Sequence, residues 1–259
     1  MFALLKYEVK DAVASIVLNR PEVYHALNPA LIQEITKAVN LASEDEEVRV
    51  IVLTSEGERA FCSGADLKEG LGEIKLPSQS LRKNYNPMIL AMRNSPKPII
   101  GGLNGIAAGA GCSLALACDI LIASENAAMS EIFVSIGLII DAGSSYFLPR
   151  IVGSQRAFEL CSTGRRLSAQ ECLSLGLVSK VVPANQFREA LEATAQQYAN
   201  APTKAIGLIK KVLNQSSHSS LEQMLELEAI HQDEAAQSYD FVEGVSAFLQ
   251  KRPAQFKGR

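Results

Sequence analysis

The chain contains no tryptophan, only three histidines and only five cysteines, and neither sign of charge dominates among its 259 residues. With 25 Lys and Arg against 28 Asp and Glu, it lacks the basic surplus that typically marks a nucleic-acid-binding protein. Gly, Asp or Ser interrupts every long apolar stretch well before it reaches the length of a membrane span. Residues 1–6 are also too short for the hydrophobic region of a secretory signal. These absences argue against nucleic acid or membrane as partners and favour a cytoplasmic protein.

The five cysteines show neither a metal-ligand spacing nor an even disulfide framework; they stand at positions 62, 112, 118, 161 and 172. We therefore expect reduced thiols in the core and no metal site. Cys62 lies beside the candidate site described below, and a small core side chain is the favoured interpretation over a nucleophile. A hydrophobic content of 47% with 20% charged residues is ordinary for a globular enzyme.

Apolar patterning predicts alternating strands and helices, and hence α/β layers, over the first part of the chain. Strands are predicted within 5–19 and 48–54 and at 99–102, 120–123 and 178–182, and helices over 29–43, from about 65, and over 111–117, 154–163 and 168–175. After Pro183 the pattern becomes almost purely helical, with helices predicted over 184–199, 202–214, 219–235 and 239–250. Residues 70–80, which contain Gly, Pro and Ser, predict a mobile surface loop.

The most informative feature is a pair of turns made of small residues, each after an apolar strand-like run. Phe61-Cys62-Ser63-Gly64-Ala65-Asp66 follows residues 50–53, and the turn from Asn104 to Cys112 follows residues 98–100. The first N–H groups of a helix have no internal partner, and small side chains let a ligand approach them. Two such donors that converge on one thioester oxygen would form an oxyanion hole and stabilise an enolate.

These turns and several separated motifs over roughly residues 10–257 resemble the crotonase (enoyl-CoA hydratase/isomerase) superfamily. The motifs are Arg20-Pro21 with His25-Ala26-Leu27-Asn28, the two turns, Cys118-Asp119-Ile120, Gly176-Leu177-Val178 and the end from Phe248 to Phe256. The resemblance implies a crotonase-type α/β spiral of ββα units over residues 1–200. It also implies a C-terminal helical trimerisation module over 201–259, and a homotrimer or dimer of trimers.

By the same resemblance, the N–H groups of Ala65 and Ala110 are the oxyanion-hole donors. The family's coenzyme A contacts are largely made by main-chain atoms, and here they imply His25, Ala26, Leu27, Ala65, Asp66, Leu67, Gly109 and Lys251 as substrate-binding residues. His25 stands where the family usually has Asn. Coenzyme A is part of the substrate, and the resemblance implies no separate cofactor.

The reaction depends on which acids face the thioester. Hydratases hold water between two glutamates, and the corresponding positions carry Ser113 and Phe133, neither of which is a carboxylate base. Asp141, in a turn otherwise built from Gly, Ala, Leu and Ile, is the candidate catalytic residue because desolvation would raise its pKa. The resemblance is to family isomerases with a catalytic Asp at this position. Glu131, near the candidate site, is the second candidate after Asp141 for the catalytic acid.

A narrower resemblance is to 1,2-epoxyphenylacetyl-CoA isomerase-like enzymes. It rests on Tyr85-Asn86-Pro87, on Gly143 and on residues 243–249, whereas Ile140 and Ser144 depart from the usual Pro and Gly. The implied activity is an acyl-CoA isomerase of fatty acid metabolism or phenylacetate catabolism, in which Asp141 shuttles a proton.

Several alternatives stay open on the sequence alone. Asp141 could merely cap the following helix, and Ser113 could back-bond within its own helix. Other functions are a hydratase of low activity, a non-catalytic CoA-binding assembly subunit, and a serine hydrolase using Ser113 or Ser144. The stretch from Asp141 to Tyr146 also resembles 4-chlorobenzoyl-CoA dehalogenase, which relies on a tryptophan that this chain lacks.

Overall fold

The computed structural model describes residues 2–70 and 76–259. Its main sheet has the strand order β1-β2-β3-β5-β7-β10. The first two strands form an antiparallel hairpin, and the others run parallel to β2. The strands are β1 (Leu5–Lys10), β2 (Val13–Leu18), β3 (Val50–Ser55), β5 (Ile99–Leu103), β7 (Ile120–Ser124) and β10 (Lys180–Val182).

A second, smaller sheet has the order β4-β6-β8-β9 and short strands. They are β4 (Ala60–Cys62), β6 (Ile106–Ala108), β8 (Ala128–Ser130) and β9 (Leu167–Ser168). Strands β4, β6 and β8 each follow a main-sheet strand directly along the chain. The neighbours β3, β5 and β7 in one sheet are therefore matched by β4, β6 and β8 in the other. This repetition is the expected spiral of ββα units, and it brings the chain segments after β4 and β6 side by side.

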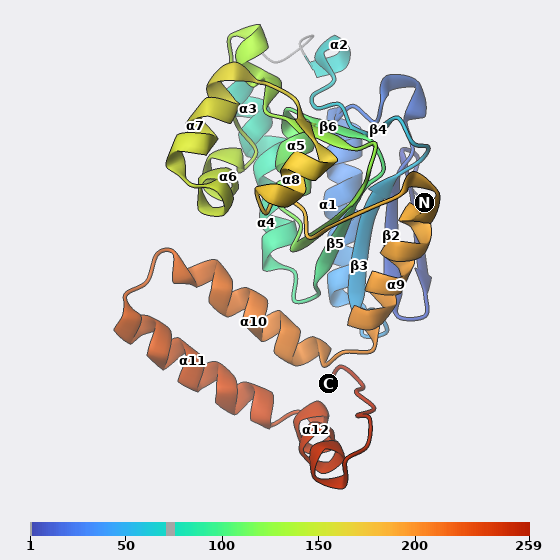
Figure 1. Cartoon of the computed structure of the whole chain (residues 1–259), viewed down its shortest axis with the longest axis vertical. Helices are drawn as coiled ribbons and strands as arrows, with labels where there is room; N and C mark the ends of the chain where they lie inside the picture. Colours follow the sequence, from blue (N-terminus) through green and yellow to red (C-terminus); the bar gives the residue numbers. More distant parts are fainter. Residues whose placement is uncertain (1, 71–75) are drawn as a thin grey trace.

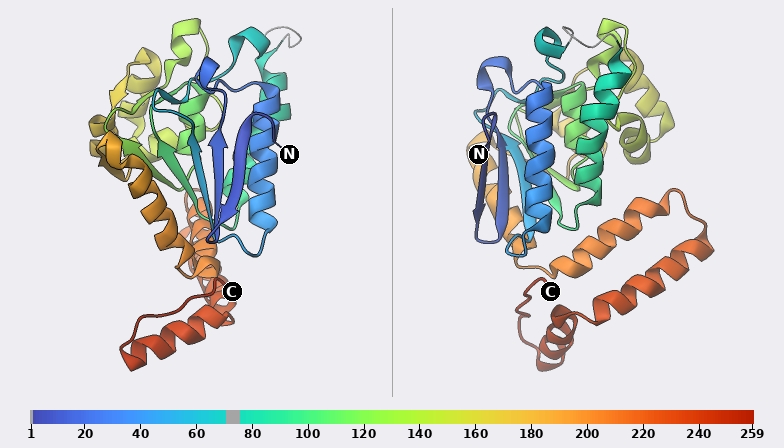
Figure 2. Two further views of the ribbon diagram at one scale, coloured as in Figure 1. Left: turned by 90° about the vertical axis from the view of Figure 1, so that its right-hand side faces the viewer. Right: turned by 180° about the vertical axis from the view of Figure 1, so that it is seen from behind.

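The main sheet is covered on both faces because its central strands are apolar on both sides. Val50 and Val52 of β3 pack with helix α9 (Phe187–Ala199), whereas Ile51 and Leu53 belong to the core that includes helix α1 (Pro29–Glu44). The two helices lie on opposite faces of the sheet (Figures 1 and 2). The N-cap residue of α1 is Asn28, whose side chain accepts a hydrogen bond from the N–H of Leu31 at 2.8 Å.

The remaining helices before α9 are mostly short and connect the strands of the two sheets. They are η1 (Pro21–Val23), α2 (Leu67–Gly70), α3 (Pro77–Ser80), η2 (Leu81–Tyr85), α4 (Asn86–Asn94), α5 (Ala110–Leu116), η3 (Ile132–Ile136), α6 (Ser144–Val152), α7 (Ser154–Thr163), α8 (Ala169–Ser174) and η4 (Ala184–Gln186). The expected helix from about Ala65 begins at Leu67. Of the loop predicted over 70–80, residues 71–75 lie outside the described residues, and Pro77–Ser80 is helical, so that part of the prediction is wrong.

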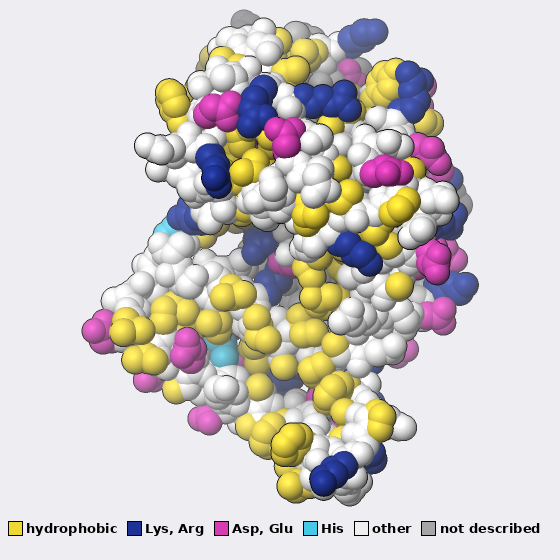
Figure 3. Space-filling view, in the orientation of Figure 1, with side chains coloured by type: hydrophobic (Ala, Val, Ile, Leu, Met, Phe, Trp, Pro, Cys, Tyr) yellow, Lys and Arg dark blue, Asp and Glu magenta, His cyan; other side chains and the backbone are white. Residues whose placement is uncertain are grey.

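Three C-terminal helices lie at one end of the α/β core (Figures 1 and 2). They are α10 (Thr203–Ser216), α11 (Leu221–Ala236) and α12 (Tyr239–Gln250). Figure 3 shows apolar side chains gathered over these helices on the side that faces the viewer. The exposed large apolar side chains of the three helices include Ile209, Leu213, Leu221, Leu225, Ile230, Phe241, Val242, Phe248 and Leu249. The chain end then folds back, and the N–H groups of Lys257 and Gly258 donate to the Asp240 carboxylate. None of the helices within residues 2–70 and 76–259 is both long and apolar enough to cross a membrane.

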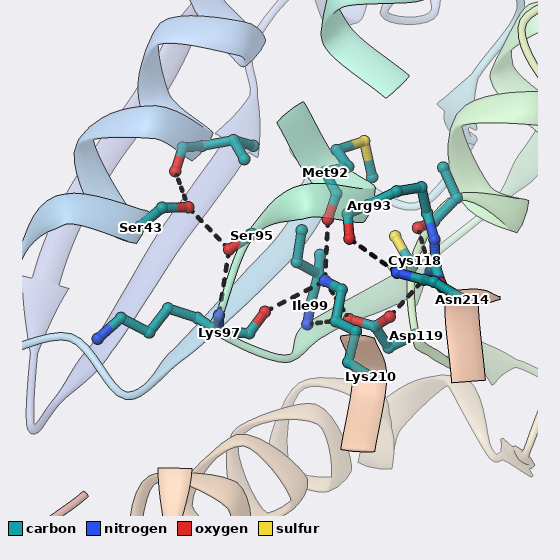
Figure 4. A network of polar contacts seen from close by, with 12 residues as sticks. Ser43, Met92, Arg93, Ser95, Lys97, Ile99, Cys118, Asp119, Lys210 and Asn214 are labelled. Atoms are coloured by element: carbon teal, nitrogen blue, oxygen red, sulfur yellow. Dashed lines mark hydrogen bonds and ion pairs between the residues drawn. The ribbon is translucent and has the colours of Figure 1, made fainter. Parts of the chain in front are cut away.

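A buried polar network attaches α10 to the core (Figure 4). The ammonium group of Lys210 lies 2.8 Å from the Asp119 carboxylate and donates to the carbonyl oxygens of Met92, at 2.8 Å, and Lys97, at 3.3 Å. Arg93 pairs with the same carboxylate at 2.8 Å. Asp119 is thus held by two cations of this chain and also accepts a hydrogen bond from the backbone at the start of β5.

We expect Lys210→Met to lower the free energy of unfolding by about 1–3 kcal/mol, because it removes a donor from two carbonyl oxygens and one of the two cations from the Asp119 carboxylate. Urea unfolding checks this, with the matched variant Lys211→Met, at an exposed position one residue further along α10, as the control. If the two variants have equal midpoints, the network does not hold α10 on the core.

Candidate functional site

The two turns predicted from the sequence meet at the ends of the neighbouring strands β4 and β6. Gly64 has φ +99°, and a Cβ added there would lie only 2.7 Å from the carbonyl oxygen of Ala108 and 3.5 Å from the Ala110 nitrogen. A Cβ on Gly111 would lie 2.2 Å from the carbonyl oxygen of Cys62. Both glycines are required because the two turns pack backbone against backbone.

The N–H groups of Ala65 and Ala110 take no part in the backbone hydrogen bonds found within residues 2–70 and 76–259. Around the first turn, Leu27 donates to Gly64 at 2.7 Å, and Asp66 donates to Leu27 at 3.0 Å. Ala110 is the first residue of α5, where a backbone N–H has no partner inside the helix. The structure thus brings two such amides together at adjoining turns, as an oxyanion hole requires.

The loop before α1 is tied to the first turn by a buried ion pair. Arg20 lies 3.0 Å from the Asp66 carboxylate and also donates to the Ala26 carbonyl at 2.5 Å. The ring of His25 is fully engaged in this loop: Nδ1 accepts from the Arg20 N–H at 3.1 Å, and Nε2 lies 2.9 Å from the Glu56 carbonyl. Burial lowers the pKa of His25, in keeping with the neutral tautomer that this pairing requires. Any coenzyme A contact at His25 therefore falls to main-chain atoms.

Asp141 lies in the turn between η3 and α6, half-buried, and its Oδ1 atom is buried without a hydrogen-bond partner among the described residues. Burial raises the pKa of Asp141 to about 6. The capping interpretation is wrong, because the N-cap residue of α6 is Gly143 and no side chain caps the helix. The turn is held by its main chain instead: the Ser144 N–H donates to the Asp141 carbonyl at 3.0 Å. Asp141 therefore has a buried carboxylate oxygen with no hydrogen-bond partner among the described residues, and its pKa is raised toward neutrality.

Tyr85 is a site residue that the sequence did not single out for a role. It is buried at the junction of η2 and α4, and its hydroxyl lies 3.5 Å from the Leu27 carbonyl. The pKa of Tyr85 is raised by burial and, to a smaller extent, by the charges of Asp141, Cys62 and Asp66. The Tyr85 hydroxyl therefore lies beside the loop before α1, and the Asp141 charge acts on it. The feature of the sequence that could have identified Tyr85 as a site residue is its place in the Tyr85-Asn86-Pro87 motif.

The two positions that carry glutamates in hydratases lie at the same turns. Ser113 is fully buried in α5; its hydroxyl lies 2.9 Å from the Asp141 carbonyl and 3.4 Å from the Gly109 carbonyl four residues earlier. The expected back-bonding of Ser113 is present as the longer of these two contacts, and the shorter contact is with the Asp141 carbonyl. A Cβ on Gly109 would lie 3.9 Å from the ring of Phe133, which places that ring beside the second turn. A second buried carboxyl group, that of Glu131, lies between β8 and η3, and burial raises its pKa to about 7.

Lys251, one of the residues predicted to bind coenzyme A, lies far from the other predicted binding residues. Leu67, exposed at the start of α2, and Gly109 adjoin the two turns. Lys251 follows α12 in a left-handed conformation, and Figures 1 and 2 place α12 at the opposite end of the chain from α2. Its neighbour Arg252 forms two hydrogen bonds with the Glu243 carboxylate, at 2.6 and 2.9 Å.

The geometry does not support Cys62, Ser113 or Ser144 as a catalytic nucleophile. The Cys62 thiol is buried, donates to the His25 carbonyl at 3.2 Å, and has its pKa raised to about 12 by burial. Ser113 and Ser144 are both fully buried and bonded to each other at 2.8 Å, so neither hydroxyl can reach a carbonyl carbon. The backbone amides and the carboxyl groups are the remaining candidates for chemistry among the described residues of the site.

Comparison with known proteins now decides the family. The model of the enoyl-CoA hydratase/isomerase family matches residues 8–259. The chain belongs to the enoyl-CoA hydratase/isomerase family, within the crotonase superfamily. A protein of Rhodobacter capsulatus named "probable enoyl-CoA hydratase" is 42% identical over 98% of each chain. The 1,2-epoxyphenylacetyl-CoA isomerase of Escherichia coli K12 is 35% identical over the whole of both chains.

A solved structure of an enoyl-CoA hydratase from Bacillus anthracis superposes with a TM-score of 0.92 at 34% identity, covering 99% of this chain and 100% of that one. A trans-2-decenoyl-[acyl-carrier-protein] isomerase of Streptococcus mutans is 32% identical over 100% of this chain and 99% of its own. This enoyl-CoA hydratase/isomerase family member thus has relatives named for both reactions. The fold and family follow from the comparisons, whereas the choice of reaction depends on the residues of the site.

Proposed function

We propose that this protein is an acyl-CoA isomerase that moves a double bond, or isomerises a ring epoxide, of a coenzyme A thioester. One observation carries the proposal: the half-buried Asp141 carboxylate has a buried oxygen without a hydrogen-bond partner among the described residues, and its pKa is raised to about 6. A carboxylate with this pKa can both remove and return a proton at neutral pH. The residues at the hydratase glutamate positions, Ser113 and Phe133, can do neither.

In the double-bond reaction the thioester oxygen accepts hydrogen bonds from the Ala65 and Ala110 amides. The Asp141 carboxylate takes a proton from the α or γ carbon, and the electron pair of the broken C–H bond moves into the thioester as an enolate. The fixed amide dipoles stabilise the negative charge as it develops. Asp141 then returns the proton at the other end of the three-carbon unit. This sequence of steps uses only groups of the chain and needs no added cofactor.

The substrate's coenzyme A is proposed to lie along the loop before α1 and the two turns, against Ala26, Leu27, Asp66, Leu67 and Gly109. Because Lys251 lies at the far end of the chain, its proposed phosphate contact requires a second copy of the protein. The exposed apolar face of α10–α12 supports assembly into a trimer or a dimer of trimers through residues 201–259, since large apolar patches mark interaction sites. A cytoplasmic role in fatty acid metabolism or phenylacetate catabolism completes the proposal.

Crotonyl-CoA hydration is expected to be slow or undetectable while isomerisation is measurable, because the water-holding carboxylates are absent and general acid–base catalysis is worth about 10²–10⁴ in rate. The measurement is an assay of the purified protein against 3-enoyl-, 2-enoyl- and epoxyaryl-CoA thioesters. Turnover of the epoxyaryl substrates alone would narrow the proposal to ring isomerisation. Hydration as fast as isomerisation would instead identify a hydratase, and its loss in Glu131→Gln would assign the water to Glu131. No turnover of any thioester, with coenzyme A still bound, would indicate a binding subunit.

A further inference from the structure

Three buried polar side chains behind the catalytic turn form a continuous series of contacts. Glu131 Oε1 lies 2.7 Å from Ser144 Oγ, which lies 2.8 Å from Ser113 Oγ, which lies 2.9 Å from the carbonyl oxygen of Asp141. The three side chains come from the end of β8, from α6 and from α5, and each residue is at most 3% exposed. The series ends on the backbone of the residue proposed to carry the reacting proton.

Counting protons decides the state of this network. Each serine hydroxyl has one proton to donate, and a carbonyl oxygen can only accept. When the Glu131 carboxyl is ionised, two protons must serve three contacts, so one contact places two oxygens together without a hydrogen between them. When Glu131 is protonated at Oε1, its O–H donates to Ser144, Ser144 donates to Ser113, and Ser113 donates to the Asp141 carbonyl. All three contacts are then hydrogen bonds.

Burial favours the same protonation state. Glu131 is 3% exposed, and its Oε2 atom has no hydrogen-bond partner within the described residues. An unpaired buried anionic oxygen is far more costly than an unpaired neutral one. Burial accordingly raises the pKa of Glu131 to about 7; the hydrogen bonds with Ser144 and with the Cys112 thiol oppose the rise, and the Asp141 charge adds to it.

Other groups around Glu131 do not titrate in this range. The titratable or charged groups on the surrounding elements are Asp141, Cys112 of α5, Cys161 of α7, Cys172 of α8 and Arg165 before β9. Burial raises the pKa of Cys161 to about 11 and that of Cys172 to about 12, and places that of Cys112 well above its usual value. Arg165 pairs with Glu159 and Glu171 at the surface. Glu131 and Asp141 are therefore the two groups of this cluster that change charge near neutral pH.

We propose that Glu131 is a positioning residue whose carboxyl proton completes a donor chain through Ser144 and Ser113 to the Asp141 carbonyl, and so fixes the turn that carries the base. This inference rests on the proposed role of Asp141 as proton shuttle. The turn needs such support because Ala142 and Gly143 both have left-handed conformations, with φ of 47° and 93°. Loss of the Glu131 proton removes one link of the chain and loosens the turn.

The test compares the pH dependence of kcat and KM in the wild type, Glu131→Gln and Glu131→Ala. In the wild type, kcat should rise as Asp141 ionises near its pKa of about 6 and fall roughly 3- to 10-fold as Glu131 ionises, the size of one neutral hydrogen bond. In Glu131→Gln the amide N–H donates to Ser144 at every pH, so kcat should stay high at alkaline pH with KM unchanged. Glu131→Ala should lose activity at every pH, and its thermal midpoint shows whether it folds.

Three outcomes of the kinetic experiment would overturn the inference. They are a wild-type profile without an alkaline decline, an alkaline decline that persists in Glu131→Gln, and a Glu131→Gln enzyme as inactive as Glu131→Ala. The infrared carbonyl band of a protonated carboxyl group, present at neutral pH and lost in Glu131→Gln, tests the proton without using activity. If Asp141→Asn retains turnover while this band is present, the proposed function fails but the protonated chain stands. If the band is absent at neutral pH, the chain fails independently of the base.

Discussion

Asp141→Asn is expected to lower isomerase turnover by about 10²–10⁴, the usual contribution of a general base. Asparagine keeps the shape of the side chain but cannot accept the proton. The Asp141 side chain makes no hydrogen bond through Oδ1 within the described residues and does not cap α6. The thermal midpoint should therefore change little, and so should the affinity for coenzyme A, because the nucleotide is expected along the loop before α1. The rise of kcat with pH near the Asp141 pKa of about 6 should also disappear.

A matched control is Asp11→Asn in the turn between β1 and β2. Asp11 is exposed and has φ 50°, a conformation that asparagine tolerates. This variant should keep the turnover, midpoint and pH profile of the wild type. Near-wild-type turnover in Asp141→Asn, measured beside this control, would show that another group is the base and would refute the proposed mechanism.

The parts of the fold that the sequence predicts well are those with long, regular patterns. The apolar β3 and β5 run in a parallel sheet, and α1 has the apolar spacing and the Asn28-Pro29 start of an amphipathic helix. Strands of two or three residues such as β4 and β9 show no measurable periodicity, and they were missed. A helix after Asp141 is considered only as something that residue could cap, and no range is predicted for α6, which begins without a side-chain cap and contains Pro149 in its last turn.

The residues of the candidate site also divide into those that the sequence pattern indicates and those that only the folded chain brings together. Gly64 and Gly111 stand out in the sequence because the close packing of two backbones admits no side chain there. By contrast, the contact between Ser113 and Ser144 joins residues 31 positions apart, and Tyr85 reaches a carbonyl 58 positions away. Tertiary packing alone creates these neighbours, so no local spacing predicts them. The role of Glu131 depends on burial and on a count of protons, which requires the three-dimensional structure.

Ala110→Val should lower kcat by about 10²–10³, or about 3–4 kcal/mol in the transition state, the usual cost of losing one oxyanion-hole donor. The Ala110 amide lies at the junction of the two turns, 3.5 Å from where a Cβ on Gly64 would lie. Two added methyl groups at this point would push the thioester carbonyl away from both amides. The backbone N–H itself is retained, so the effect comes from bulk and not from a changed donor. Turnover must be measured per folded molecule, together with the thermal midpoint.

The matched control for this experiment is Ala115→Val, which adds the same two methyl groups to the same helix, away from the turns. Ala110 is 3% exposed and Ala115 is fully buried, so both substitutions overpack a core and should each cost roughly 1–3 kcal/mol of stability. Ala115→Val should nevertheless keep its turnover per folded molecule, because its amide lies inside α5. If Ala110→Val loses activity only in proportion to folded protein, as the control does, Ala110 is a core residue and the thioester oxygen binds elsewhere. A hundredfold loss in a folded Ala110→Val, with the control active, would place that oxygen at the second turn.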